Sequence, residues 1–326
     1  MNLLKIDNLK TSFKTDDGIV QAVRGISFHI DKGEAVGIVG ESGCGKSVTM
    51  LSLLGLNSGN AIVEADDIDF DGVDLLELDN KSMRALLGNE ISMIFQDPMT
   101  SLNPLYTVGN QLMEPLKIHQ KMDKKQAYAR AIELLNLVQM PAPESRMKQY
   151  PFEFSGGMRQ RIMIAIAMAC NPKLLIADEP TTALDMTIQA QILDLMKNVK
   201  EKTGSSIVMI THDLGVIINM CSRVMVMYAG LIIEEGLVEE IFANPQHPYT
   251  LGLIRSLPKF EKKRSGKLYS IPGSPPDLLK PPTGCPFADR CEHTMKVCKL
   301  YMPEKKSYSD THHVCCWLSR NKEEVV

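Results

Sequence analysis

The chain has 326 residues, of which 44% are hydrophobic and 23% are charged, and its formal net charge is −3. This composition excludes a disordered, collagen-like or coiled-coil chain, and the charge offers no bulk attraction for nucleic acid. The sequence contains no run of about 18 apolar residues, which is the length needed to span a membrane. Because residues 1–10 lack a charged-then-apolar signal sequence, we expect a cytoplasmic protein. The length predicts one large domain and a smaller one.

Short β-branched runs alternate with longer helical patterns over residues 1–240. Four apolar runs near turn residues predict buried strands of a largely parallel sheet, at 35–39, 174–177, 207–210 and 224–227. Helices are expected at 47–56, 123–138 and 158–169, the second of them capped by Asp123. A mostly helical insertion at about 97–170 interrupts the alternation. The fold class predicted from this pattern is α/β.

A glycine-rich loop follows the predicted strand at 35–39. Residues 40–47 fit the phosphate-binding pattern G-x-x-x-x-G-K-[ST], between a predicted strand and a predicted helix. The glycines let backbone N–H groups surround phosphate oxygens, and the helix N-terminus adds partial positive charge. Lys46 is expected to reach the β- and γ-phosphates, and the Ser47 hydroxyl to bind Mg²⁺. The predicted ATP-binding residues of this segment are Gly40, Ser42, Gly43, Cys44, Gly45, Lys46, Ser47 and Val48.

Two later segments fit the same chemistry. Ser155-Gly-Gly157 precedes a predicted helix and therefore offers a second anion-binding N-terminus. Asp178 and Glu179 end an apolar strand, where two acids without other context indicate a solvated loop. After a matching phosphate loop, Asp178 fits the Mg²⁺-facing carboxylate of a P-loop NTPase. Glu179 then fits a general base that polarises the attacking water.

The order of the motifs resembles the ABC-type ATPase cassette over roughly residues 3–240. The motifs are the phosphate loop, Gln96, Ser155-Gly-Gly157, Asp178-Glu179, Ala183-Leu-Asp185 and His212. The resemblance implies a RecA-like core with a β-subdomain and an inserted helical subdomain. Phe154 and Met158 stand where the commonest family form has Leu and Gln. Because the serine and both glycines are intact, we expect a working turn.

In this family two cassettes pack head to tail around two nucleotides, and each ATP lies between one phosphate loop and the partner's serine-glycine turn. The resemblance assigns Gln96 to Mg²⁺ and water, and His212 to the γ-phosphate. It assigns Asp185 to the dimer interface and Phe13 to the adenine, with a buried core phenylalanine as the alternative. The implied catalytic residues are Glu179, His212 and Gln96. The implied Mg²⁺ ligands are Ser47, Gln96 and Asp178, and the implied nucleotide-binding residues outside the loop are Phe13, Ser155, Gly156, Gly157, Asp178 and Asp185.

Three further segments resemble the ATP-binding subunits of bacterial dipeptide and oligopeptide importers, at 96–104, 244–254 and 271–276. The resemblance implies a peripheral subunit on the cytoplasmic face of the cell membrane. Its implied partners are two transmembrane permease subunits, whose coupling helices the insertion receives, a second homologous ATPase and an extracytoplasmic peptide-binding protein, with no nucleic acid. The alternatives are the ATPase of a nickel or other small-solute importer, a soluble non-transport ABC ATPase and a redox-sensing module.

The composition changes after about residue 243, which divides the chain into an ATPase domain at 1–243 and a C-terminal part at 244–326. Ten of the 18 prolines lie in the second part, and they predict an extended arm because proline suits neither a helix interior nor a central strand. Five of the eight cysteines crowd the end of the chain, at Cys285, Cys291, Cys298, Cys315 and Cys316. Since a cytoplasmic chain disfavours disulfides, a metal or redox role is expected.

These cysteines are spaced more widely than the C-x₂₋₄-C pairs of structural zinc. Four thiolates also suit an iron–sulfur cluster, and similar tails in the transporter subfamily include some with a [4Fe–4S] cluster. The expected ligands are Cys285, Cys291, Cys298 and Cys316, with Cys315 as the alternative fourth ligand. Zn²⁺ and unligated thiols remain alternatives.

The other three cysteines are scattered. Cys44 lies in the phosphate loop, where a helix N-terminus can lower the pKa of a thiol. One hypothesis is that its alkylation blocks ATPase activity; the alternative is a small side chain without consequence. Cys170 and Cys221 are expected to be buried apolar fillers.

Overall fold

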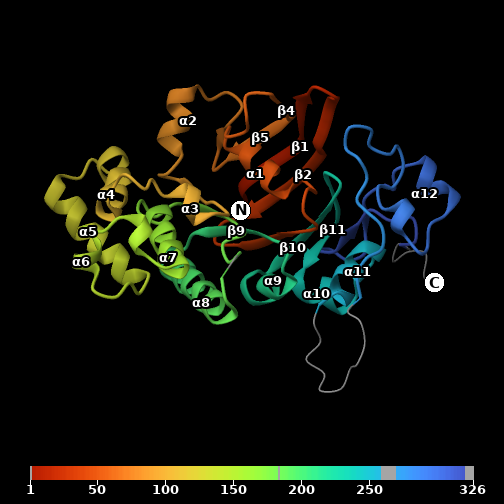
Figure 1. Cartoon of the computed structure of the whole chain (residues 1–326). Coiled ribbons are helices and arrows are strands. Elements are labelled where there is room, and N and C mark those ends of the chain that lie inside the picture. The colour runs from red at the N-terminus through yellow and green to blue at the C-terminus, as the bar shows by residue number, and fades with distance from the viewer. Residues whose placement is uncertain (1, 183, 258–268, 320–326) are drawn as a thin grey trace, which may run out of the picture. The chain divides into compact units, whose positions relative to one another are not determined.

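The computed structural model describes residues 2–182, 184–257 and 269–319 (Figure 1). The chain divides into two compact units. Unit 1 comprises Met1–Leu3, Ile30–Ala35 and Asp71–Met209, and unit 2 comprises Leu4–His29, Val36–Phe70 and Ile210–Val326. Both units are therefore assembled from segments that are distant in the sequence.

Unit 2 contains an antiparallel sheet and a second, mixed sheet. The antiparallel sheet includes β1 (Asn2–Thr15), β2 (Gly18–Asp31), β4 (Ala61–Glu64) and β5 (Asp67–Phe70), with β1 in register with β4 and β5. In the mixed sheet, β3 (Ala35–Val39) pairs in parallel with β10 (Arg223–Tyr228), which pairs with β11 (Leu231–Leu237). The short strands β13 (His313–Val314) and β12 (Lys306–Ser307) extend this sheet from β11. The chain's C-terminal segment thus completes a sheet that begins near residue 35.

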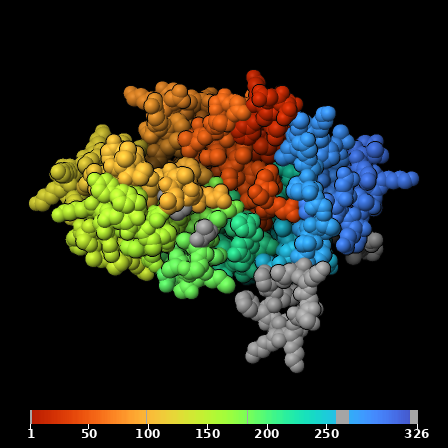
Figure 2. All heavy atoms as spheres, viewed as in Figure 1, coloured from red at the N-terminus to blue at the C-terminus, as the bar shows by residue number. Residues whose placement is uncertain are grey.

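The helices of unit 2 are short. They are α1 (Lys46–Leu53), α9 (Leu214–Met220), α10 (Val238–Ala243), α11 (Pro248–Arg255), the 3₁₀ turn η2 (Ala288–Arg290) and α12 (Lys296–Leu300). In α11 the first residue is Pro248, whose fixed φ and missing N–H suit that position. The proline-rich segment 269–284 contains neither helix nor strand, as its prolines predict. Its Leu278 carbonyl accepts a hydrogen bond from the Gln21 N–H of β2 at 2.9 Å, and Figure 2 shows blue C-terminal residues against red N-terminal ones.

Unit 1 carries the helical insertion. Its elements are β6 (Val73–Asp74), α2 (Asn80–Leu86), β7 (Ile91–Ile94), α3 (Pro98–Ser101), α4 (Val108–His119), α5 (Lys124–Leu137), α6 (Pro143–Arg146), the 3₁₀ turn η1 (Pro151–Glu153), α7 (Gly156–Ala167), β8 (Leu174–Asp178) and α8 (Met186–Thr203). The strand β9 (Ser206–Thr211) crosses into unit 2. Strands β7 and β8 run parallel, and α4, α5 and α7 pack on one another.

The predicted elements are confirmed. All four apolar runs are strands, and their interiors are buried. Asp123 caps α5 through a capping box with Gln126, and Ala127, Ala131 and Leu134 form the buried face. The helix after the phosphate loop ends at Leu53 rather than 56, and the helix expected from residue 158 begins at Gly156. Within the described residues, no helix has the length and apolar content needed to cross a bilayer.

Candidate functional site

The phosphate loop joins the end of β3 to the start of α1 within unit 2. Gly45 occupies the N-cap position of α1 with φ +103°, a conformation that residues with a side chain rarely adopt. A Cβ atom on Gly45 would lie 2.5 Å from the Ala22 carbonyl oxygen, and one on Gly40 would lie 2.2 Å from that of Met227. Glycine is therefore required at both positions by the backbone path and by close packing.

The Lys46 side chain forms hydrogen bonds to the backbone of this loop. The buried Lys46 ammonium donates hydrogen bonds to the carbonyl oxygens of Gly40, at 2.8 Å, and Glu41, at 2.9 Å. Within this fully described helix, no side chain caps the N-terminus of α1 and no acidic residue lies in the first turn. The helix therefore begins with its positive dipole end uncompensated by its own side chains, which suits an anionic ligand.

Cys44 does not have the environment that the sequence suggested. Its side chain is buried, and burial raises the pKa of the thiol, an effect that the Lys46 ammonium only partly offsets. The expectation that the helix N-terminus lowers the pKa of this thiol is therefore wrong, because desolvation of the thiolate outweighs the favourable charge. That alkylation of Cys44 blocks ATPase activity stays a prediction. Of the other two scattered cysteines, Cys170 is buried as expected, whereas Cys221 is only half-buried.

The acidic pair ends β8 in unit 1. Asp178 is buried, and Glu179 has φ +45°, in the left-handed region that is uncommon for a residue with a side chain. The Glu179 carboxylate accepts a hydrogen bond from Gln96 Nε2 and another from Thr182 Oγ1, each at 2.9 Å. The structure thus brings together Gln96 and Glu179, which lie 83 positions apart. Two side-chain donors therefore orient the Glu179 carboxylate.

The serine-glycine turn begins α7, also in unit 1. Ser155 is the N-cap residue, but its side chain makes no capping hydrogen bond, and both Ser155 and Gly156 are exposed. A Cβ atom on Gly157 would lie 2.7 Å from Ile188 Cγ2, so packing against α8 requires glycine there. Phe154, where the family form commonly has leucine, is buried, and the Arg146 guanidinium lies 5.8 Å from its ring centroid. This substitution therefore fills the core beneath the turn and leaves the turn exposed.

The remaining expected site residues lie in varied settings. Asp185 is the N-cap of α8 and accepts a hydrogen bond from the Ile188 N–H at 2.9 Å. Phe13 is half-buried on β1, in register with Ala61 of β4. His212 is exposed after β9. Ser42 and Gly43 are exposed at the tip of the loop, and Ser47 and Val48 are half-buried in the first turn of α1. Ala183 lies outside the described residues.

The phosphate loop also contains an ion pair that no sequence motif predicts. The Glu41 carboxylate binds both terminal nitrogens of Arg290, at 2.6 and 2.9 Å, and the Arg290 side chain is only 6% exposed. The Glu41 N–H donates a hydrogen bond to the Tyr249 hydroxyl at 2.8 Å. The loop pattern leaves the position of Glu41 unspecified, and the 249 positions between the ionic partners carry no local signal.

Four C-terminal thiols lie near one another. Burial raises the pKa of Cys285 to about 11, with smaller contributions from the charges of Cys316, Cys298 and Cys291. The pKa of Cys316 is likewise raised by burial and then by the charges of Cys291 and Cys298. Among the described residues, however, no group of three or more His, Cys, Asp or Glu side chains is arranged to hold a metal ion. The expected iron–sulfur or zinc site therefore has no preformed geometry in this structure.

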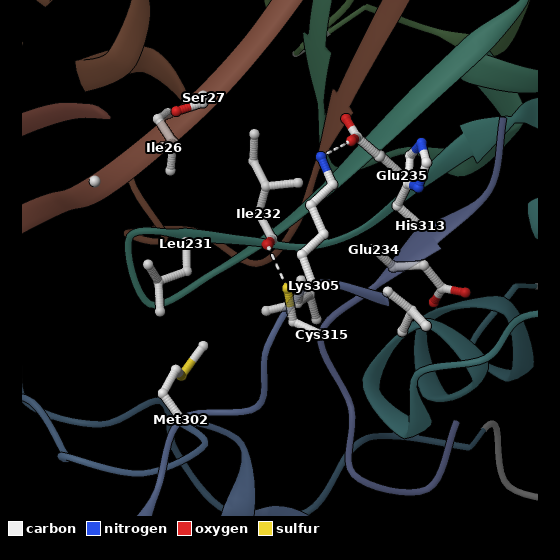
Figure 3. A pocket seen from close by; sticks show the side chains of 13 residues that line it. Ile26, Ser27, Leu231, Ile232, Glu234, Glu235, Met302, Lys305, His313 and Cys315 are labelled. Atoms are coloured by element: carbon white, nitrogen blue, oxygen red, sulfur yellow. Dashed lines mark hydrogen bonds and ion pairs between the residues drawn. The ribbon is translucent and has the colours of Figure 1, made fainter. Parts of the chain in front are cut away.

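Cys315 lies in a different setting, beside a cavity of about 230 Å³ (Figure 3). Its thiol donates a weak hydrogen bond of 3.8 Å to the Ile232 carbonyl oxygen. The neighbouring ion pair joins Lys305 and Glu235. Of the four nearby thiols, only Cys316 contributes to the raised pKa of Cys315, after the effects of burial, Lys305 and Glu235. Cys315 thus lies beside the Lys305–Glu235 ion pair and the cavity.

The class of protein follows from the two units taken one at a time. Unit 2 has a glycine-rich loop with an inward-pointing lysine between a buried strand and a helix. Unit 1 has an acidic pair after a buried strand and a glycine turn that opens a helix. Together with the helical insertion, these features define an ABC-type ATPase.

Comparisons with known proteins identify the family. The family model described as ABC transporter matches residues 23–182, and the one described as the oligopeptide/dipeptide transporter C-terminal region matches residues 233–298. The oligopeptide transport ATP-binding protein OppD of Bacillus subtilis (strain 168) is 54% identical over 97% of this chain and 88% of its own length. The dipeptide transport ATP-binding protein DppD of the same organism is 54% identical over 99% of this chain and 96% of its own.

A solved structure shows the same fold. The ATP-binding cassette MJ0796, in a dimeric post-hydrolysis state bound to ADP and Pi, aligns with a TM-score of 0.65 and 29% identity, over 72% of this chain and 98% of its own. The chain belongs to the ABC transporter family, among the ATP-binding proteins of oligopeptide and dipeptide transport. The resemblance and fold class expected from the motifs are confirmed, and the chain is an ATPase.

Proposed function

We propose that this chain hydrolyses ATP to power the import of dipeptides or oligopeptides through a membrane transporter. The observation that carries this proposal is similarity over nearly the whole chain, at 54% identity, to relatives named for oligopeptide and dipeptide transport. The match at residues 233–298 to a C-terminal region named for these transporters adds support. The function thus rests on both the ATPase motifs and the segment that follows them.

The residues of the ATP site divide the chemistry between them. The loop at 40–47 binds the phosphates through its N–H groups and Lys46, while Phe13 stacks on the adenine. In this proposal Ser47, Asp178 and Gln96 would hold Mg²⁺, which would neutralise charge on the β- and γ-phosphates.

The hydrolytic step depends on a second group of residues. Glu179 accepts a proton from the attacking water, because its carboxylate is already oriented by Gln96 and Thr182. His212 contacts the γ-phosphate. These residue roles are proposals that the hydrogen bonds within unit 1 and the loop geometry within unit 2 support.

A second cassette completes each ATP site in this proposal. Support comes from the exposed N-terminus of α7, where the Ser155 side chain leaves the helix uncapped, and from the dimeric cassette of similar fold. Asp185 lies at the interface between the cassettes. Each cassette then contributes a loop to one nucleotide and a turn to the other.

The proposed complex is attached to the cytoplasmic face of the membrane. Two permease subunits bind the helical insertion at about 97–170, and an extracytoplasmic peptide-binding protein delivers the solute. The proposed division places the ATPase domain at 1–243 and the arm with the cysteine module at 244–326.

A finer proposal concerns the cysteine module: Cys285, Cys291, Cys298 and Cys316 bind a [4Fe–4S] cluster, with Zn²⁺ as the alternative. The Cys285 N–H donates a hydrogen bond of 2.7 Å to the Cys298 carbonyl oxygen, which supports the proximity of these two ligands. The position of Cys315 beside the Lys305–Glu235 ion pair favours Cys316 as the fourth ligand. The full chain, purified without oxygen, should be brown and contain iron and sulfide. A colourless protein with stoichiometric zinc would contradict the cluster.

Transport by the reconstituted complex tests the main proposal. Proteoliposomes containing this chain, its partner ATPase and both permeases, supplied with the binding protein, should accumulate labelled dipeptides or oligopeptides when ATP is present. The same vesicles with Lys46→Ala in this chain should lose most of that uptake. ATP-dependent uptake of Ni²⁺ without uptake of any peptide would overturn the peptide assignment and leave the ATPase assignment intact.

A further inference from the structure

An ion pair between the half-buried Glu41 and the buried Arg290 joins the phosphate loop to the C-terminal module inside unit 2. The two terminal nitrogens of Arg290 bind the two carboxylate oxygens of Glu41, at 2.6 and 2.9 Å. This fork-to-fork geometry is the strongest form of an Arg–carboxylate pair and constrains orientation as well as distance. Glu41 is the residue directly after the first glycine of the loop.

Arg290 is itself held firmly. Its Nε donates a hydrogen bond of 2.8 Å to the Pro272 carbonyl oxygen, and its NH1 donates one of 3.2 Å to the Tyr228 hydroxyl. The guanidinium lies 5.8 Å from the ring centroids of Tyr228 and Phe287. Because the proline-rich arm, β10 and η2 all hold it, Arg290 is a rigid support for the loop.

On the phosphate loop, Glu41 is also in contact with Lys46, the lysine proposed to bind phosphate. The Glu41 N–H is bound by Tyr249 of α11, and the Glu41 carbonyl oxygen accepts a hydrogen bond from Lys46 Nζ at 2.9 Å. Tyr249 packs against Tyr228 and Phe287, with ring centroids 4.6 and 5.4 Å apart. The side chain, N–H and carbonyl oxygen of Glu41 are therefore each held by a hydrogen bond. The C-terminal region provides the partners of the side chain and of the N–H.

We propose that Arg290 is a positioning residue of the ATP site, through which the C-terminal module sets the affinity of the phosphate loop for ATP. Two effects act together. Arg290 holds Glu41 where its carbonyl aims the Lys46 ammonium, and it neutralises a carboxylate that otherwise repels the triphosphate. This inference rests on the proposed role of residues 40–47 in binding phosphate.

Nucleotide binding and steady-state kinetics of the full chain test this role. Arg290→Ala should weaken MgATP binding, measured with a fluorescent ATP analogue, about tenfold, because it leaves the Glu41 charge unpaired beside the phosphates. In the assembled transporter the same variant should raise the KM for ATP and leave kcat at saturating ATP nearly unchanged. Arg290→Lys should lie between, since it keeps the charge but loses the fork.

Rescue separates positioning from a general loss of structure. Arg290→Ala combined with Glu41→Gln should bind MgATP more tightly than Arg290→Ala alone, because the unpaired charge is gone. Arg130→Ala is the matched control, since Arg130 pairs with Glu133 on the surface of unit 1, and it should bind like the unsubstituted chain. If Arg290→Ala does not fold, Arg290→Lys carries the same comparison.

The outcomes also separate this inference from the proposed ATP site. If the unsubstituted chain and Lys46→Ala bind MgATP equally, the loop assignment fails. If Lys46→Ala loses binding while Arg290→Ala and Arg290→Lys bind like the unsubstituted chain, the loop assignment stands and the positioning role is overturned. A fall in kcat and thermal stability without rescue by Glu41→Gln also overturns it.

Discussion

Two helices of this chain begin at glycine-rich turns, and their environments differ. At the start of α1, Gly45 and Lys46 are buried, and Glu41 in the loop before them is bound by Arg290 and Tyr249. At the start of α7, Ser155 and Gly156 are exposed and the serine side chain makes no cap. The N-terminus of α1 is therefore buried within its own unit, whereas the N-terminus of α7 is exposed at Ser155 and Gly156.

This difference indicates that the two turns depend to different degrees on a second cassette. Helix N-termini leave up to four N–H groups without intrahelical partners, and these groups bind anions, water or side chains. The loop before α1 is shaped by packing that residues within unit 2 provide. The turn before α7 is exposed at Ser155 and Gly156, although Phe154 is buried beside it and Ile188 packs close to Gly157. We therefore expect the loop to bind ATP in a single chain and the turn to act only with a second cassette.

Removing the enclosed cation should have the largest effect. Lys46→Ala deletes the ammonium expected at the β- and γ-phosphates, and kcat/KM for ATP should fall on the order of 10²–10³-fold. Steady-state ATPase assays of the assembled transporter measure this loss. Lys197→Ala, which removes an exposed lysine of α8, should be neutral; an equal loss in that variant would refute the assignment.

Blocking the exposed turn should separate binding from hydrolysis. Ser155→Arg places a long side chain over the N-terminus of α7 without disturbing a capping bond, since Ser155 makes none. ATPase activity of the assembled complex should fall about 10²-fold, the typical effect of losing charge-stabilising donors. Equilibrium binding of MgATP to the isolated chain should not change. Weaker binding by the isolated chain would contradict the division of roles.

Removing a hydrogen bond that orients the Glu179 carboxylate should have a smaller effect on ATPase activity. Gln96→Ala removes one of the two side-chain donors that hold Glu179 and also a proposed Mg²⁺ ligand, whereas Thr182→Val removes only the other donor and isolates the orienting effect. We expect kcat to fall about tenfold, because losing an orienting hydrogen bond costs less than losing the general base. Thr182→Val is the matched variant for the other donor, and a comparable fall there would support orientation by both. If neither variant changes kcat, the orienting role is wrong.

Lowering the pH should destabilise the packing that supports the phosphate loop. Of the four changes, this one should affect activity at neutral pH the least. His247 caps α11, which carries Tyr249, and burial lowers the pKa of this histidine to about 4 from the ordinary 6.5. The unfolded chain therefore binds more protons between these values, so the free energy of unfolding falls as pH drops from about 6.5 to 4. The loss is about 3 kcal/mol when complete.

Urea unfolding followed across this pH range measures the contribution of His247. In the unsubstituted chain, His247 Nδ1 accepts a hydrogen bond from the Tyr249 N–H. His247→Asn keeps an acceptor for this N–H, but the asparagine side chain does not titrate. The variant should show a flatter pH dependence than the unsubstituted chain. Equal slopes would show that the histidine is not kept neutral by burial.

Much of the site was readable from the sequence because its signals are local. The loop at 40–47 and the turn at 155–157 each need glycines within a few residues, and both occupy the predicted junctions before helices. The capping of α5 by Asp123 was predicted for the same reason. The expected lowering of the Cys44 pKa was wrong because a helix N-terminus is visible in the sequence, whereas the burial that raises the pKa of the thiol is not.

The sequence by itself determined the family, the order of the motifs and the alternating strands and helices, since hydrophobic periodicity and turn chemistry act between neighbours in the chain. Only the tertiary structure decided which distant groups meet. Arg290 reaches Glu41 across 249 positions, Gln96 reaches Glu179 across 83, and β13 pairs with β11. Such contacts depend on how whole elements pack, and a charge on one residue leaves no local pattern that specifies its partner.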